Sequence, residues 1–152
     1  MKYKIIKGIT NLSNCHLMRF DGNAKPNPGD ISSGIIFYSP ETRTIIYEYG
    51  LYKEGKFNNN ESECVCLIKG LEYSLQHNIF DLVIEGDSQF ALDIISKKPK
   101  GSYSTYYKDI QILIDIFDTI IIKHIPRKEN SIADNVARKA YELKKNFVTE
   151  YF

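Results

Sequence analysis

Four acidic residues stand where strands end or helices begin in the predicted secondary structure: Asp21, Glu63, Asp87 and Asp134. Asp21 closes an apolar stretch before the turn-forming run "GNAKPNPG", and Asp87 closes the run "LVIEGD". Glu63 and Asp134 lie in the first turns of two predicted helices. Each acid also has a structural explanation, because Asp opens turns and acids favour helix N-termini. Ser131 and Asp134 even have a spacing that resembles a capping box.

A cluster of these acids would be a metal site. Parallel strand ends and the adjoining helix termini meet at one edge of an open α/β sheet, so Asp21 and Asp87 lie side by side if their strands are neighbours. Gathered carboxylates repel one another, and bound cations relieve that repulsion. Such ligands suit Mg²⁺ or Mn²⁺ rather than Zn²⁺. Two such ions roughly 3.5–4 Å apart can activate a water and stabilise the leaving oxygen of a phosphodiester.

The elements that must position these acids follow from the hydrophobic pattern. β-branched and aromatic runs predict strands, and apolar residues at helical spacing predict amphipathic helices. We expect strands over residues 15–21, 33–38, 44–52, 81–87 and 119–125, and helices over 61–77, 88–97, 104–118 and 131–145. This order predicts an α/β fold, with a mixed sheet of five strands and helices on both faces.

Composition sets broader limits. A chain of 152 residues with a formal net charge of +1 is long enough for one domain with a real core, and its charge balance gives no argument for or against nucleic-acid binding. The most apolar run, "ILIDIFDTIII", contains Asp115 and Asp118 and does not predict a membrane span. The three cysteines fit a reducing compartment. We expect an intracellular, cytoplasmic monomer, with the nucleus as an alternative location.

Four segments carry a resemblance to a known family. "FDGNAKPNPG", "NNNESECVCLIKGLE", "EGDSQFALDII" and "HIPRKENSIADNVARKA" look like the signature blocks of type 1 ribonuclease H, in the family's order. The resemblance runs from about residue 15 to 145 and is closest to the compact archaeal and plant-like branch. It implies a ribonuclease H-like fold whose first three strands are antiparallel. It also implies Mg²⁺-dependent cleavage of the RNA strand of an RNA–DNA hybrid, leaving 5′-phosphate and 3′-hydroxyl ends, with Mn²⁺ as a substitute.

The resemblance also assigns roles to the four acids. By analogy with the family, Asp21 bridges two ions, Glu63 and Asp87 complete one of the sites, and Asp134 helps to hold the other ion. Glu63 also belongs near a ribose 2′-hydroxyl, the group that distinguishes RNA from DNA. Arg127 matches the position in the last block that assists proton transfer or product departure, while we assign His124 to the preceding strand.

Amide side chains match the family's positions in the minor groove of the hybrid: Asn27, Asn59, Asn60 and Gln89. Asn58 stands where many relatives have a threonine in a pocket for a DNA phosphate, and an amide can still bind a phosphate. The segment "KKPKGSYSTYYK" replaces the basic protrusion of the bacterial branch. Its lysines and tyrosines form either a reduced substrate grip or a solvated loop, and the sequence leaves both open.

The resemblance divides the chain into an N-terminal extension (1–13), a ribonuclease H domain (14–146) and a C-terminal tail (147–152). Two other functions compete with hybrid cleavage. One is a catalytically silent nucleic-acid-binding module of the same fold, and the other is a phosphoryl-transfer enzyme of the integrase or resolvase kind. A silent binder would gain nothing from a repulsive acid cluster, and the amides favour ribonuclease H over the second alternative.

Overall fold

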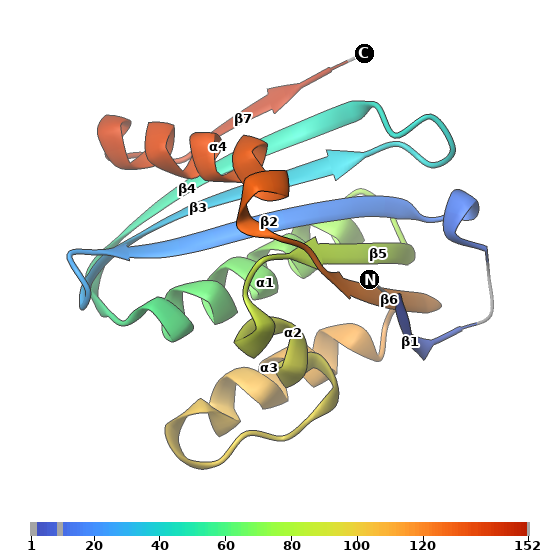
Figure 1. Cartoon of the computed structure of the whole chain (residues 1–152), viewed down its shortest axis with the longest axis horizontal. Coiled ribbons are helices and arrows are strands. Elements are labelled where there is room, and N and C mark those ends of the chain that lie inside the picture. The colour runs from blue at the N-terminus through green and yellow to red at the C-terminus, as the bar shows by residue number, and fades with distance from the viewer. Residues whose placement is uncertain (1–2, 9–10, 152) are drawn as a thin grey trace.

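The computed structural model describes residues 3–8 and 11–151, which form a seven-stranded sheet with helices on both faces (Figure 1). The strands lie in the order β1-β6-β5-β2-β3-β4-β7. The strands are β1 (Lys4–Lys7), β2 (His16–Lys25), β3 (Gly29–Tyr38), β4 (Ile45–Phe57), β5 (Asp81–Gly86), β6 (Thr119–His124) and β7 (Phe147–Glu150). The helices are α1 (Asn59–Gln76), α2 (Gln89–Ser96), α3 (Ser104–Ile114) and α4 (Ser131–Leu143).

The predicted α/β fold is confirmed, and the five expected strands are β2 to β6. The first three of them, β2, β3 and β4, pair antiparallel in chain order. β5 then lies parallel to β2 on its other side, and β6 lies parallel to β5. β2 is therefore central, and the C-terminal end of β5 lies beside Phe20 in the middle of β2. This register places Asp21, inside β2, next to the segment that follows β5.

Two strands of four residues extend the sheet beyond the expected five. β1 pairs antiparallel with β6 at one edge, and β7 pairs antiparallel with β4 at the other. The sequence "KIIK" of β1 is too short to show an alternating pattern, so pairing with an existing edge decides its conformation. Residues 1, 2, 9, 10 and 152, which belong to the two predicted terminal segments, lie outside the described residues. The predicted domain limits stay a prediction.

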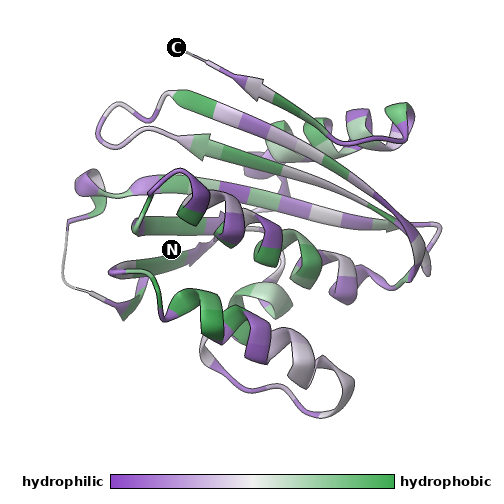
Figure 2. Cartoon of the chain, turned by 180° about the vertical axis from the view of Figure 1, so that it is seen from behind, coloured by the Kyte–Doolittle hydropathy of each residue, from purple (hydrophilic) through white to green (hydrophobic). Residues whose placement is uncertain are grey.

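The core has two layers, one on each face of the sheet. Helices α1, α2 and α3 cover the face that carries Met18, Phe20 and Ile84, and α4 covers the face that carries Leu17 and Val83. Seen from behind, α1 crosses in front of the sheet, and its apolar and polar residues lie on different sides of the helix (Figure 2). Within the described part of the chain, no helix is long and apolar enough to cross a membrane.

Helix α1 begins at a capping box. The Asn58 side chain accepts a hydrogen bond from the Glu61 amide at 2.7 Å, and the Glu61 side chain accepts one from the Asn58 amide at 3.0 Å. These two bonds satisfy amides that the first turn leaves free. They fix the start of the helix two residues before the predicted 61, and they place Glu63 one turn into it.

Candidate active site

Three of the four predicted acids meet at the edge of the sheet. Phe20 of β2 lies opposite Gly86, the last residue of the parallel strand β5, so Asp21 comes next on β2 and Asp87 directly follows β5. Glu63 approaches from α1, which packs across β2. One carboxylate oxygen from each of Asp21, Glu63 and Asp87 lies within 4.8 Å of the others.

Asp21 is held in an environment that disfavours its charge. Its side chain is almost completely buried, at 6% exposure. Burial is the main cause that raises the pKa of Asp21 to about 7, and the negative charges of Asp87 and Asp134 raise it further. The side-chain amide of Asn23, which donates to Asp21 Oδ2 at 3.4 Å, opposes this rise. Asp21 is therefore a carboxyl group whose charge depends on a nearby cation.

The environment of Glu63 also disfavours the charged form of its carboxyl group. Burial raises the pKa of Glu63 well above its usual range, and the charges of Asp21 and Asp87 add to that effect. The backbone amide of Gly22 donates to this carboxyl group and opposes the rise. Among the described residues, the buried Oε2 atom of Glu63 has no hydrogen-bond partner. A buried acceptor without a partner is costly, so this oxygen is available to a ligand that the cluster binds.

Asp134, the fourth acid, lies beside the cluster rather than within it. Its carboxylate pairs with Arg138 one turn further along α4, at 3.1 Å. Its charge still acts on Asp21, as the raised pKa of Asp21 shows. The structure therefore brings together Asp21, Glu63 and Asp87 and places Asp134 next to them.

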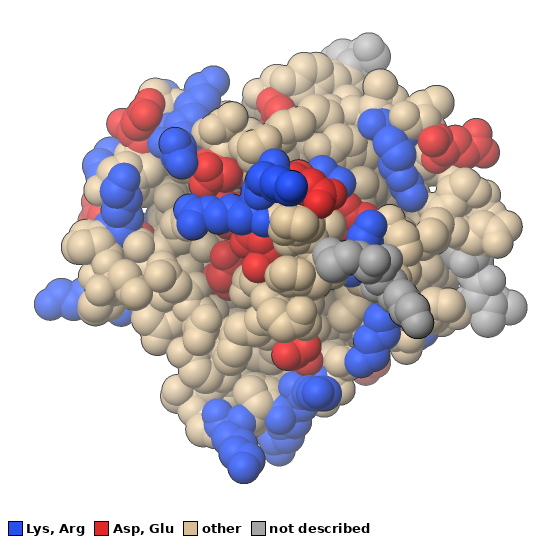
Figure 3. All heavy atoms as spheres, in the orientation of Figure 1, with Lys and Arg blue, Asp and Glu red and all other residues tan. Residues whose placement is uncertain are grey.

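Two cavities adjoin these acids. The cavity over the three clustered acids has a volume of about 430 Å³, and the second, which Asp134 lines, has a volume of about 700 Å³. The two share Asn23, Asn59 and Arg127 as lining residues. Acidic side chains gather near the middle of this face, bordered by Lys and Arg side chains (Figure 3). Together the cavities form a polar depression with acids at its centre and cations around it.

Some predicted substrate and catalytic residues line this depression. Asn60 lines the acidic cavity, and Asn59 lines both cavities while its Oδ1 accepts from the Ala24 amide at 3.1 Å. Arg127 begins the 3-10 turn Arg127–Asn130 that leads into α4, and it lines both cavities. His124 ends β6, and its ring also lines the acidic cavity, with Nε2 at 3.1 Å from the Asp87 carbonyl oxygen.

Other predicted substrate residues lie outside both cavities. Asn27 is exposed in the turn between β2 and β3. Asn58 caps α1, and its Nδ2 donates to the Tyr103 hydroxyl at 3.1 Å. Gln89 donates to Asp93 within α2 at 2.8 Å. Their roles toward a substrate stay predictions, and Asn58 already has a structural role.

Two asparagines of the site carry no distinct signal in the sequence. Asn23 follows Asp21 on the same face of β2, because β2 continues through "GNAK" instead of ending at Asp21. Asn130 is 1% exposed, and its Nδ2 donates to the Phe20 carbonyl at 2.9 Å and to Asp87 Oδ2 at 3.3 Å. A polar residue in the turn before a helix is read first as a cap, which hides the contact with Asp87.

The cluster fits a hard divalent cation. Its donors are carboxylate oxygens, its acids repel one another, and Glu63 offers a buried oxygen without a protein partner in the described structure. Magnesium and manganese take such ligands, whereas zinc favours nitrogen and sulfur. Asp21, Glu63 and Asp87 would hold such an ion, and Asp134 lies next to them.

A family described as reverse transcriptase-like matches residues 19–140, which include all three clustered acids and Asp134. The chain belongs to this family. Its domain is ribonuclease H-like, as the four sequence blocks predict. A ribonuclease HI from Halobacterium salinarum is 31% identical over 130 residues, which are 81% of this chain and 62% of that protein. The chain thus spans less than two thirds of this relative's length.

Solved structures agree on the fold of this ribonuclease H-like domain. The ribonuclease H1 of Halobacterium salinarum has a TM-score of 0.75 at 26% identity, covering 84% of this chain and 97% of that one. The N-terminal ribonuclease H domain of a Mycobacterium tuberculosis protein has a TM-score of 0.77 at 25% identity, covering 84% and 94%. LC11 ribonuclease H1, solved with an RNA/DNA hybrid, has a TM-score of 0.73 at 22% identity, covering 85% and 98%.

Proposed function

We propose that this protein is an endonuclease that hydrolyses the RNA strand of RNA–DNA hybrids with Mg²⁺, leaving 5′-phosphate and 3′-hydroxyl ends. One observation carries the proposal. One oxygen from each of Asp21, Glu63 and Asp87 lies within 4.8 Å of the others, where β2, α1 and the end of β5 meet in a ribonuclease H-like fold. A cluster of buried acids destabilises the protein unless it binds cations, so a role that needs cations explains why it is there.

Each acid has a distinct part in this proposal. Asp21 is central, because both Asp87 and Asp134 act on its charge, and it is the candidate to bridge two ions. Glu63 and Asp87 complete one site, and Asp134 contributes to the other once Arg138 releases it. The bound ions would supply activation of a water and stabilisation of the leaving oxygen. Arg127, which lines both cavities, is placed to attract the phosphate and to assist departure of the product.

Selectivity for the hybrid would come from the residues around the acids. Asn59 and Asn60 line the cavity over the cluster and present amide groups to the substrate. Amides bind base edges and sugar oxygens without strong sequence preference. Glu63, on the same helix, is the candidate to accept from a ribose 2′-hydroxyl, which duplex DNA lacks. Asn27 and Gln89 would add contacts further from the acids, and Gln89 must first release Asp93.

The similar proteins support the same substrate. The Halobacterium salinarum relative is named a ribonuclease HI, and the LC11 structure of the same fold contains an RNA/DNA hybrid. The shared fold alone does not distinguish hybrid cleavage from other phosphoryl transfer. The argument for hybrid cleavage therefore rests on the acids and amides of this chain.

A panel of end-labelled duplexes tests the proposal. The wild-type protein is incubated in Mg²⁺ with an RNA–DNA hybrid labelled on either strand, with duplex DNA, with duplex RNA and with a four-way DNA junction. We expect cuts only in the RNA strand of the hybrid. The upstream fragment should carry a 3′-hydroxyl that a polymerase extends, and the downstream fragment a 5′-phosphate that a phosphatase removes.

The same panel distinguishes the alternatives. Retained binding of the hybrid without any cut, in Mg²⁺ and in Mn²⁺, would identify a silent binding module. Cleavage of the junction or of duplex DNA would indicate an integrase- or resolvase-like enzyme. An Asp21→Asn variant of equal purity is the matched control, because a contaminating nuclease would cut equally in both preparations.

A further inference from the structure

An ion pair between the buried Glu85 and the partly exposed Arg19 lies directly behind the acid cluster. Arg19 of β2 and Glu85 of β5 lie opposite each other on these parallel strands, two residues before Asp21 and Asp87. Side chains alternate along a strand, so Arg19, Asp21 and Glu85 lie on the same face of the sheet, and Asp87 directly follows β5. The Glu85 side chain is 4% exposed, and its Oε1 accepts from Arg19 Nε at 2.9 Å.

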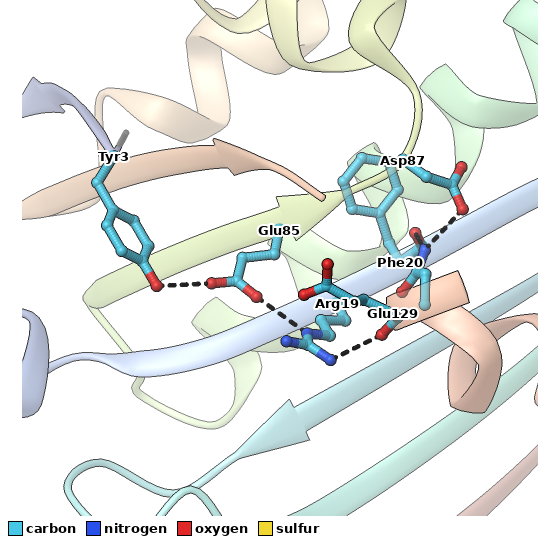
Figure 4. A network of polar contacts seen from close by, with 7 residues as sticks. Tyr3, Arg19, Phe20, Glu85, Asp87 and Glu129 are labelled. Carbon is cyan, nitrogen blue, oxygen red and sulfur yellow. Dashed lines mark hydrogen bonds and ion pairs between the residues drawn. The ribbon is translucent and has the colours of Figure 1, made fainter. Parts of the chain in front are cut away.

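Both members of this pair have second partners. The other Glu85 oxygen accepts from the Tyr3 hydroxyl at 3.0 Å, so the segment before β1 also contacts the pair (Figure 4). Arg19 Nη1 donates to the backbone carbonyl of Glu129 at 2.9 Å. The planar guanidinium therefore joins the central strands to the turn Arg127–Asn130. Its Nε binds Glu85 of β5, and its Nη1 binds the backbone of the turn.

That turn reaches the acid cluster through its last residue. Asn130 directly follows Glu129, whose carbonyl Arg19 holds. Its buried Nδ2 donates to the Phe20 carbonyl and to Asp87 Oδ2, while its Oδ1 has no partner in the described part of the chain. A displacement of the turn would change the orientation of Asp87 directly, and α4, which begins at Ser131, carries Asp134.

We propose that Arg19 and Glu85 are positioning residues for the candidate metal site: the pair fixes the turn 127–130, and through Asn130 it sets the orientation of Asp87. This inference rests on the proposed function only in treating Asp87 as a metal ligand. A stability role explains the pair less well, because burying the Glu85 carboxylate offsets much of its attraction to the partly exposed Arg19. Groups that orient a metal ligand matter for affinity instead, and their loss typically weakens metal binding 10- to 100-fold.

The test replaces the pair without leaving a charge buried. Arg19→Met/Glu85→Leu substitutes apolar groups of similar size, so the fold should persist with a melting temperature near that of the wild type. We expect Mn²⁺ affinity, measured by titration calorimetry, to fall about 10-fold. Amides of residues 127–134 should lose protection from hydrogen exchange. In hybrid cleavage, kcat should fall with little change in KM.

Two further variants keep the result interpretable. Arg19→Lys retains the charge but not the planar guanidinium. We expect this variant to fold and to have a Mn²⁺ affinity between those of the wild type and the double variant. If the double variant does not fold, Arg19→Lys alone carries the test. Arg43→Met is the matched control, because Arg43 also holds backbone carbonyls, those of Leu12 and Cys15, at a turn away from the acids. It should change thermal stability without changing Mn²⁺ affinity.

The outcomes separate this inference from the proposed function. Wild-type Mn²⁺ affinity and wild-type exchange in a folded Arg19→Met/Glu85→Leu or Arg19→Lys protein would overturn the positioning role. A wild-type protein that binds Mn²⁺ but does not cut hybrid would refute the proposed function and leave the positioning role to the affinity and exchange measurements. A wild-type protein that binds no Mn²⁺ would overturn the positioning role as well, because Asp87 would then not be a metal ligand.

Discussion

Gly22 lies directly against the backbone carbonyl of Ser62. A Cβ atom at position 22 would lie 2.6 Å from the Ser62 oxygen, closer than real Cβ contacts. The close approach brings α1 onto β2 at the residue after Asp21, and Ser62 directly precedes Glu63. The glycine of "FDGN" therefore does more than open a turn, because it permits the two acids to meet.

We expect Gly22→Ala to destabilise the protein by about 1–3 kcal/mol, the usual cost of forcing extra atoms into a packed contact. It should also weaken Mn²⁺ binding, because the helix that carries Glu63 must move. Urea denaturation and titration calorimetry measure the two effects. Gly101→Ala is the control, because a Cβ there meets no atom within 4 Å and only its φ of +74° causes strain. It should cost about 1 kcal/mol and leave metal affinity unchanged.

Replacing Asp21 should separate folding from activity. Asp21→Asn removes a ligand charge and keeps the shape of the side chain, so hybrid cleavage should fall by more than about 100-fold, beyond the usual loss for groups that only orient a ligand. The melting temperature in EDTA should rise, because repulsion within the cluster falls. A folded Asp21→Asn protein with wild-type turnover would contradict the assignment.

The raised pKa of Asp21 predicts how stability depends on pH without metal. This pKa rises from 3.8 to about 7, mainly through burial. Between pH 3.8 and about 7, Asp21 is protonated in the folded protein and has released its proton in the unfolded chain. The contribution of Asp21 to the free energy of unfolding is therefore complete below pH 3.8. It is lost as the pH rises through about 7, the pKa of Asp21 in the folded protein. In EDTA, the melting temperature should fall more steeply from about pH 5 to 8 in the wild type than in Asp21→Asn. If the melting temperature fell equally steeply with pH in both proteins, the raised pKa of Asp21 would be contradicted.

Metal binding should have the opposite dependence on pH. Cations bind the deprotonated acids, so Mn²⁺ affinity and cleavage should rise with pH as Asp21 and Glu63 lose their protons. A higher Mg²⁺ concentration should move this rise to lower pH, because metal and proton compete for the same oxygens. Rates measured across pH at two Mg²⁺ concentrations check this. Superimposable profiles would show that the titrating group is not a ligand.

The lysines between α2 and α3 offer a test of the substrate grip. Lys97, Lys98 and Lys100 are exposed, and Lys and Arg side chains gather at the lower end of the face in Figure 3, over this connection. Tyr103 and Tyr106 instead contact Asn58 and Glu61 at the start of α1. Replacing the three lysines with alanine should raise KM severalfold at low salt with little change in kcat, because uniform binding is lost. Unchanged kinetics at low and moderate salt would mean a solvated loop.

Much of this site follows from the sequence because strand ends and helix starts are local features. The pattern correctly places Asp87 directly after an apolar strand, and the predicted strand end at Asp21 is wrong because β2 continues to Lys25. The two strands are parallel neighbours, so the two acids still meet. Glu63 follows from the helical period of α1. These assignments need only the period of the side chains and the rule that parallel strands end at one edge of the sheet.

Contacts between distant segments do not follow from the sequence. Asn130 reaches Asp87 because a turn far along the chain packs on the end of β2, and no local pattern encodes that contact. The Arg19–Glu85 pair depends on the register of two strands that are separated by β3, β4 and α1. Edge strands β1 and β7 depend likewise on pairing partners rather than on their own four residues.

The most direct test of the account compares the wild type and Asp21→Asn on one substrate, an RNA–DNA hybrid labelled at the RNA 5′ end, in Mg²⁺ and at equal concentration of folded protein. The account predicts that the wild type cuts the RNA strand at internal positions, that Asp21→Asn does so more than about 100-fold more slowly, and that EDTA stops the wild-type reaction. Wild-type protein that leaves the hybrid intact in both Mg²⁺ and Mn²⁺, or equal cleavage by the two proteins, would contradict it.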